Sequence, residues 1–215
     1  PADLKLETPI LHNLAHVHNA NGDNRLAVDL MRTAHASALA SGNPGMQAMA
    51  SLNLGLFLLE DGDPEQARES LHWALELSRS TGHQVIEMHA LDSLGTLYLQ
   101  VNALDAAQDA IQAALHLAVT SGAKQAELEA RLQLGKLLLR QGHLAAARQE
   151  LDCSLQQARE VQSLKEEGAV HEVLSDLHQR AGQAELALEH NRATLRIEDR
   201  KSTRLNSSHV SESRM

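Results

Sequence analysis

Histidines are the residues of this chain that first suggest chemistry, because the sequence holds thirteen of them against one cysteine. His12 and His16 are four residues apart, so on a helix they would share one face, where two imidazoles can bind zinc. No third ligand is apparent beside them. We therefore interpret both as polar side chains on the solvent-facing surface of a helix, and we interpret His171 and His178 in the same way.

Nucleophiles and phosphate-binding loops give no better candidate for a reactive site. Cys153 has no nearby histidine or basic cluster that would activate its thiol. Gly55, Gly95 and Gly135 are spread along the chain instead of forming a Gly-x-Gly cluster after a strand. We expect no catalytic residues, no metal, no cofactor and no enzymatic activity from this segment. The question whether a catalytic domain follows this segment in the natural protein stays open.

Composition and charge narrow the class of protein. Most of the 43% apolar content is Ala and Leu and only 1% is aromatic, which favours helices over a β-sandwich or barrel. The net charge of −9 argues against a nucleic-acid partner, because neutralising phosphates needs a basic surface. The longest stretch without acidic or basic residues, 33–59, contains Gly42-Asn43-Pro44, so it predicts a turn and not a membrane span. We expect a cytoplasmic protein; the chain begins with Pro1, so its natural start is missing or was processed away, and any signal peptide would have been lost with it.

A forty-residue repeat organises the chain. A Leu-Gly pair or its equivalent recurs at Leu14-Ala15, Leu54-Gly55, Leu94-Gly95, Leu134-Gly135 and Leu174-Ser175. Seven residues later stands a residue suited to the left-handed turn that ends a helix, at Gly22, Gly62, Asn102, Gly142 and Gly182. Alanine recurs at Ala27, Ala67, Ala107, Ala147 and Ala187, and a second small column at Ala34, Ala74, Ala114, Ser154 and Thr194.

Small residues at fixed spacing mark places where two helices approach closely. Each repeat therefore predicts a helix hairpin, with the glycine column on its first helix and the alanine columns on its second. Asp63-Pro64-Glu65 provides an N-cap and a proline suited to the start of a second helix. Second helices are expected to end at Gly42, Gly82 and Gly122.

The pattern resembles the tetratricopeptide repeat (TPR) family in its long, forty-residue form. In the second repeat the family's positions are occupied by Leu54-Gly55, Ala67, Leu71 and Ala74. The resemblance implies an all-α, right-handed solenoid of about five hairpins. It covers a domain of residues 1–198, truncated at the N-terminus, with units at about 3–42, 43–82, 83–122, 123–162 and 163–198.

The resemblance also implies a concave groove lined by the first helices, where partners bind as extended peptides or helices. The groove positions, carried over residue by residue, are Met49, Leu52, Leu56, Leu59 and Glu60, then His89, Asp92, Thr96, Leu99 and Gln100, then Glu129, Leu132, Lys136, Leu139 and Arg140. Five leucines in the second and fourth units would form an apolar path along this groove. Two interpretations of them stay open: they form a ligand or dimer surface, or they are ordinary core.

The C-terminal residues differ from the repeats. Helical periodicity stops near Glu198, and residues 199–215 resemble a translated adapter of the kind used in sequencing libraries. We expect this segment to be a non-native or disordered tail.

Two functions stay open at this point. One is a protein-interaction scaffold that binds a peptide or helix of a partner protein in the groove. The other is the sensory or regulatory arm of a larger bacterial signalling protein, such as a diguanylate cyclase, histidine kinase or transcription regulator, whose output domain is missing. We expect a protein or peptide partner, no nucleic acid and no membrane, and a homo-oligomer stays open.

Overall fold

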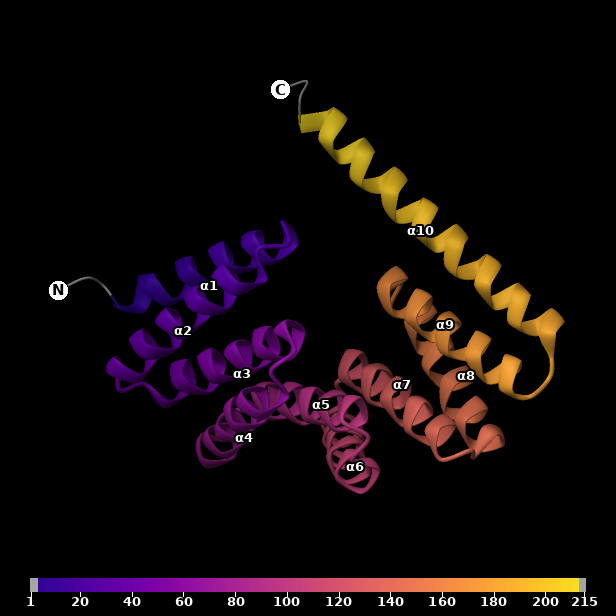
Figure 1. Cartoon of the computed structure of the whole chain (residues 1–215), viewed down its shortest axis with the longest axis horizontal. Coiled ribbons are helices and arrows are strands. Elements are labelled where there is room, and N and C mark those ends of the chain that lie inside the picture. The colour runs from indigo at the N-terminus through magenta and orange to yellow at the C-terminus, as the bar shows by residue number, and fades with distance from the viewer. Residues whose placement is uncertain (1–3, 213–215) are drawn as a thin grey trace. The chain divides into compact units, whose positions relative to one another are not determined.

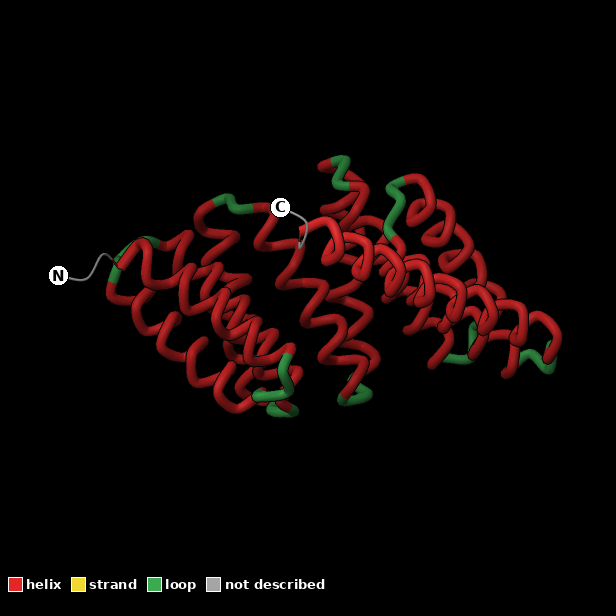
Figure 2. The backbone as a smooth tube through the Cα atoms, turned by 90° about the horizontal axis from the view of Figure 1, so that it is seen from above, coloured by secondary structure: helices red, strands yellow, loops and turns green. Residues whose placement is uncertain are grey.

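The computed structural model describes residues 4–212, with side chains placed for residues 8–200 and 202. Helices and short turns make up this described part, in which there is no strand (Figure 2). The chain divides into two compact units, unit 1 with residues 1–117 and unit 2 with residues 118–215. Both units are built from helix hairpins, as the sequence repeat predicts (Figure 1).

Unit 1 begins with two complete hairpins. Its helices are α1 (Leu4–Ala20), α2 (Asn24–Ala40), α3 (Pro44–Asp61), α4 (Pro64–Thr81), α5 (Gln84–Gln100) and most of α6 (Leu104–Ser121). The two helices of a hairpin pack on each other, α1 on α2 and α3 on α4. The second helix of one hairpin also packs on the first helix of the next, α2 on α3 and α4 on α5, so the hairpins stack in sequence order.

Unit 2 repeats the same arrangement. It contains α7 (Lys124–Arg140), α8 (Leu144–Glu160), α9 (Leu164–Arg180) and α10 (Ala184–Glu212). A core cluster joins its hairpins, and the cluster includes Leu151 and Leu155 of α8 together with Val170 and Leu174 of α9. Contact between α8 and α9 therefore buries apolar side chains from both helices.

Left-handed residues separate the helices at the predicted positions. Gly22, Gly62, Gly142 and Gly182 have φ between 73° and 85°, and Asn102 in the same column has φ 57°. Gly42, Gly82 and Gly122 follow the second helices with φ between 66° and 71°. Gln162 takes this role in the fourth repeat with φ 57°, although nothing in its side chain predicts a positive φ. At the start of α4 the side chain of Asp63 accepts a hydrogen bond from the backbone N–H of Gln66 at 3.1 Å, which confirms the predicted N-cap.

The glycine column lies where the two helices of a hairpin are closest. A Cβ atom at Gly55 would be 2.7 Å from the side chain of Leu71, and one at Gly135 would be 2.6 Å from that of Leu151. Ala67 and Ala147 on the facing helices are completely buried. The small columns are therefore required by close helix packing, as the sequence analysis predicts.

The last helix is longer than the periodicity suggests. α10 continues to Glu212, through residues for which we expected an unpatterned tail. An existing helix adds each further residue with one backbone hydrogen bond, so it can extend without an apolar face. The side chains of residues 203–212 and the whole of residues 213–215 lie outside the described part of the chain. The interpretation of residues 199–215 as translated adapter stays a prediction.

Candidate functional site

The structure divides the fifteen predicted groove residues by burial. Six are exposed: Met49, Leu56, Glu60, His89, Gln100 and Arg140. Five are half-buried: Leu59, Asp92, Thr96, Glu129 and Lys136. Four are buried: Leu52, Leu99, Leu132 and Leu139. Three of the five leucines in the predicted apolar path are thus buried, and Leu132 and Leu139 belong to the core cluster of unit 2. For these three the core interpretation holds, because the helices pack closely enough to enclose them.

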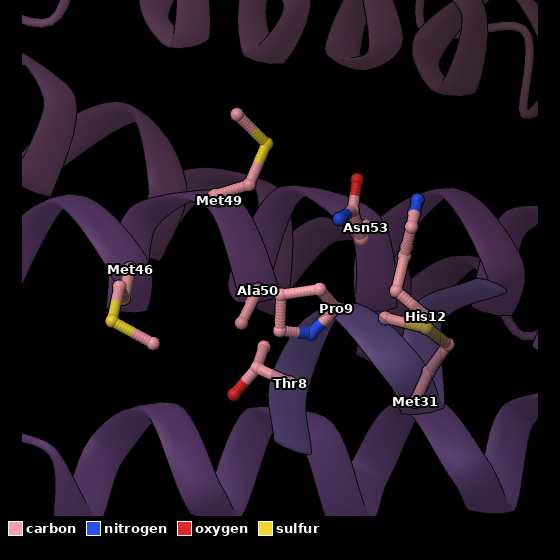
Figure 3. Close-up of a pocket in the computed structure, with 8 residues that line it drawn as sticks. All are labelled: Thr8, Pro9, His12, Met31, Met46, Met49, Ala50 and Asn53. Atoms are coloured by element: carbon pink, nitrogen blue, oxygen red, sulfur yellow. The ribbon is translucent and has the colours of Figure 1, made fainter. Parts of the chain in front are cut away.

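An apolar pocket remains where the first two hairpins of unit 1 meet. It has a volume of about 280 Å³ and is open to solvent on one side. Its lining comes from α1, α2 and α3, and consists of Thr8, Pro9, His12, Met31, Met46, Met49, Ala50 and Asn53. Figure 3 shows the three methionines placed around Pro9 and Ala50. Met49 is the one predicted groove residue that lines it.

Local sequence explains how the pocket walls are positioned. The side chain of Asn43 caps α3 by accepting hydrogen bonds from the backbone N–H groups of Gly45 at 3.0 Å and Met46 at 3.2 Å. Met46, Met49 and Asn53 then follow at helical spacing, which places all three on one face of α3. The opposite wall is α1, where Thr8 and His12 are one turn apart.

His12 is one of the polar residues that line the pocket. Its ring lies edge-on to that of His16, with 4.4 Å between the ring centroids. Burial, and then the neighbouring His16, hold the pKa of His12 below its ordinary value, so the imidazole is neutral at pH 7. Its Nδ1 atom is buried and has no hydrogen-bond partner within the described part of the chain. The wall of the pocket therefore includes a neutral imidazole whose Nδ1 atom is enclosed.

The two histidines do not form a metal centre with their surroundings. The ring of His16 packs against Phe57 at 4.9 Å, and no group of three potential metal ligands occurs among the described residues. His12 and His16 thus take part in ring packing, and His12 also forms part of the pocket wall.

Sequence reasoning missed most of the pocket, although one signal could have found its α1 wall. The groove positions were carried over to the second, third and fourth repeats only. Moving forty residues back from Met49 and Leu52 gives Pro9 and His12, which both line the pocket. Met31 and Met46 have no such signal, because they lie outside the groove columns.

The expectation of exposed histidines in the last hairpin is wrong. His171 and His178 are buried on α9. The Nδ1 atoms of His171 and His190 are 2.8 Å apart, and the ring of His178 stacks on that of His190 at 5.2 Å. Burial, followed by the neighbouring imidazole of this group, lowers the pKa of both His171 and His190. These rings are buried because α10 supplies a third imidazole that covers them.

Comparison with known proteins identifies the fold. No protein-family model and no curated protein sequence matches the chain. The solved structure of BtubC (BKLC) from P. vanneervenii matches with a TM-score of 0.73 at 18% identity, over 89% of this chain and 80% of that one. A Podosopora anserina structure described as a kinesin light chain with nearly identical TPR-like repeats matches with a TM-score of 0.68 at 17% identity, over 90% of this chain and 95% of its own. The chain has a tetratricopeptide-like repeat fold.

A regulator has the same tetratricopeptide-like fold over part of its length. The Rap conjugation gene regulator of plasmid pLS20, solved in complex with the Phr* peptide, matches with a TM-score of 0.80 at 15% identity. The match covers 93% of this chain but 55% of the regulator. The predicted fold class, an all-α solenoid type built from tetratricopeptide-like hairpins, is confirmed. Among the described helices, none has both the length and the apolar character needed to cross a membrane.

Proposed function

We propose that the chain is a protein-interaction scaffold that binds a peptide segment of a partner protein and holds one apolar side chain of that segment in the pocket of unit 1. The observation that carries this proposal is the pocket itself, an apolar hollow with a few polar groups at its wall. Such hollows are the usual form of a binding site. No catalytic group is assigned to it, and we propose a binding role without catalysis for this segment.

Size and lining favour a side chain as the ligand. A volume of about 280 Å³ lies at the lower end for small-molecule pockets and suits one large apolar side chain. Met31, Met46 and Met49 supply polarizable, flexible side chains, which adapt to ligands of different shape. Leucine, methionine and phenylalanine are therefore the residues that we expect to occupy the pocket.

Polar groups at the pocket wall can fix the orientation of a bound peptide. The amide of Asn53 at the wall can form hydrogen bonds with the backbone of a peptide whose side chain fills the pocket. Leu56 lies on α3, seven residues after Met49, and is also exposed. A peptide that leaves the pocket along α3 would contact it. The peptide complex of the Rap regulator is consistent with this class of ligand.

A selection with a built-in control tests the proposal. A phage-displayed library of random peptides is selected on the wild-type chain and, in parallel, on the variant Met46→Trp/Met49→Trp, whose two larger rings occupy the pocket. We expect peptides that share one large apolar residue and bind the wild type at least tenfold more tightly by calorimetry. Leu188→Gln, which removes an exposed leucine of unit 2, should leave their affinity unchanged. Peptides that bind the filled variant equally well, or failure to enrich any peptide, would contradict the proposal.

A second candidate function is a regulatory arm within a longer signalling protein. The Rap regulator is consistent with it, because the match covers 55% of that chain and leaves the rest of the regulator without a counterpart here. The test is to recover the natural coding sequence after Glu198 and to measure whether a selected peptide changes the activity of the domain encoded there. A natural stop codon at this point would rule out a downstream output domain.

A further inference from the structure

One side of α3 leads from the pocket of unit 1 to an acidic helix end. Met49 and Asn53 line the pocket and point the same way from the helix (Figure 3). Leu56 and Glu60 follow them at helical spacing, so the four residues form one stripe along α3. Leu56 and Glu60 are both exposed. A peptide whose side chain fills the pocket can therefore continue along this stripe to the C-terminal end of α3.

The carboxylates at this end of α3 have no basic partner. Glu60 accepts a hydrogen bond from the neutral amide of Asn19 at 2.6 Å. Within the described part of the chain, neither Glu60 nor Asp61 forms an ion pair, and the last turn of α3 holds no basic residue. The C-terminal end of a helix already carries a partial negative charge from its backbone carbonyls. A cation placed beside Glu60 and Asp61 would therefore be stabilised.

Neighbouring first helices of unit 1 add no positive charge to this surface. Residues 8–20 of α1, all of α3 and all of α5 contain no Lys or Arg. The charged residues of α5 are Glu87 and Asp92, and Glu87 is paired with Arg79 of α4 at 2.8 Å. The first helices of unit 1 thus have a negative net charge.

The same column has the opposite charge in unit 2. Forty-residue steps from Glu60 lead to Gln100 on α5, Arg140 on α7 and Arg180 on α9. Arg140 and Arg180 stand in the last turns of their helices, where a basic residue is favourable. The acidic end of α3 is therefore particular to unit 1 and is not required by the repeat.

We infer that the peptide bound by unit 1 carries a basic residue, Lys or Arg, at a fixed distance from its apolar anchor. This inference rests on the proposed function, because the pocket must hold the anchor. Glu60 stands eleven residues after Met49, which corresponds to about 16 Å along a helix axis. An extended peptide covers that distance in about five residues. Charge complementarity at such an exposed position selects among peptides that all fill the pocket.

Peptide selection on a charge-swapped chain tests the inference. The variant Glu60→Arg/Asp61→Gln copies Arg140-Gln141 of the fourth repeat into the end of α3. A phage-displayed library with one position fixed as leucine and the others random is selected on the wild type and on this variant. We expect wild-type peptides to carry Lys or Arg about four to six residues from the leucine, and variant peptides to carry Asp or Glu there.

Calorimetry measures the size of the effect. The charge swap should weaken binding of a wild-type-selected peptide about fivefold at low salt, because the new contact is exposed and repulsive. The difference should disappear in about 1 M salt, which screens exposed charges. A difference that salt leaves unchanged would contradict a charge contact at this position.

A matched control separates local charge from net charge. Glu69→Arg/Glu76→Gln changes the net charge equally, and both residues are exposed on α4, which does not line the pocket. It should select the same basic peptides as the wild type. Circular dichroism establishes that each variant is folded. If the swapped chain is not, Glu60→Gln/Asp61→Asn replaces it, and its peptides should show no preference for Lys or Arg.

The outcomes distinguish this inference from the proposed function. Peptides that lose binding when their leucine becomes serine, but show no preferred charge at a fixed distance, would overturn this inference alone. A preference that the control variant changes as much as the charge swap does would assign it to the net charge of the chain and would also overturn the inference. Failure to enrich any peptide on the wild type would overturn both.

Discussion

The two junctions between hairpins in unit 1 are built from the same columns but differ in their filling. At the first junction, between α1 and α3, His12 and Met46 line an open pocket. At the second, between α3 and α5, the equivalent residues are Leu52 and Ile86, and both are buried. The same columns of the repeat thus line a hollow in one place and form core in the other.

This difference teaches that the repeat supplies the scaffold and that departures from it supply the site. His12 stands where later units hold Leu52, Asp92 or Leu132, and it brings a neutral imidazole to the pocket wall. The proposed binding site thus lies where the side chains of a few positions depart from the repeat.

The largest change in stability is expected when the second junction, between α3 and α5, is opened. Leu52→His with Ile86→Met copies the first junction into the second. It removes apolar packing and buries an imidazole, so the free energy of unfolding should fall by about 2 to 5 kcal/mol. Urea unfolding followed by far-UV circular dichroism measures the change. An unaltered midpoint would mean that Leu52 and Ile86 do not fill the second junction.

Larger side chains should close the first junction. Met46→Trp with Met49→Trp should lower the affinity for a selected peptide at least tenfold, which corresponds to about 1.4 kcal/mol. It should leave the unfolding midpoint nearly unchanged, because the added rings occupy an open hollow and leave no cavity behind. Calorimetric titration and urea unfolding give the two values. Lost affinity together with lost stability would point to misfolding of the variant and would break the comparison.

The His171–His190 pair in the last hairpin should make the free energy of unfolding depend on pH. His171 and His190 have a lowered pKa in the folded chain, so the unfolded chain binds more protons as the pH falls below about 6.5. The free energy of unfolding therefore has its full value above pH about 6.5 and decreases as the pH falls toward the folded-state pKa of the two histidines. Urea unfolding at a series of pH values measures the slope.

A matched variant separates this histidine pair from the other titrating groups. In the preceding hairpin the same two columns hold Arg131 and Glu150, whose side chains form an ion pair at 2.8 Å. His171→Arg with His190→Glu copies that pair into the last hairpin. It should flatten the decrease in stability below pH about 6.5, because neither new group titrates there. An unchanged slope would assign the pH dependence to other residues.

The smallest effect is expected at His12. Its pKa is lowered by burial and by His16, but it lies in an open pocket, where solvent screens the charge. The loss of stability below pH about 6.5 should therefore be only slightly smaller in His12→Leu than in the wild type. Urea unfolding of the two proteins at the same pH values compares them. If His12→Leu altered the pH dependence of stability more than replacement of the His171–His190 pair does, the expected order of the two effects would be wrong.

Much of the hairpin pattern could be predicted from the sequence, because helix ends and close contacts depend on particular residues. The left-handed turns favour Gly or Asn, and the close contact of Gly55 with Leu71 needs a residue without Cβ. The turn at Gln162 gave no such signal. Helix spacing also predicted that first and second helices alternate through the chain.

The pocket could not be predicted in the same way. A hollow forms where side chains from several helices together leave a space unfilled. Here the side chains are Met31 from α2, Met46 from α3 and His12 from α1. The burial of His171 and His178 was missed for a related reason, since it depends on His190 of the next helix. Both features depend on contacts between helices that the pattern of one helix does not reveal.

Methionine methyl signals test the central claim most directly. The sequence holds five methionines, and Met31, Met46 and Met49 line the pocket, while Met88 is buried on α5. A spectrum of methyl-labelled methionine is recorded during titration with a selected peptide. The account predicts that the signals of Met31, Met46 and Met49 shift as the peptide saturates and that the signal of Met88 stays in place. Saturable binding that leaves the three pocket methionines unmoved would contradict it.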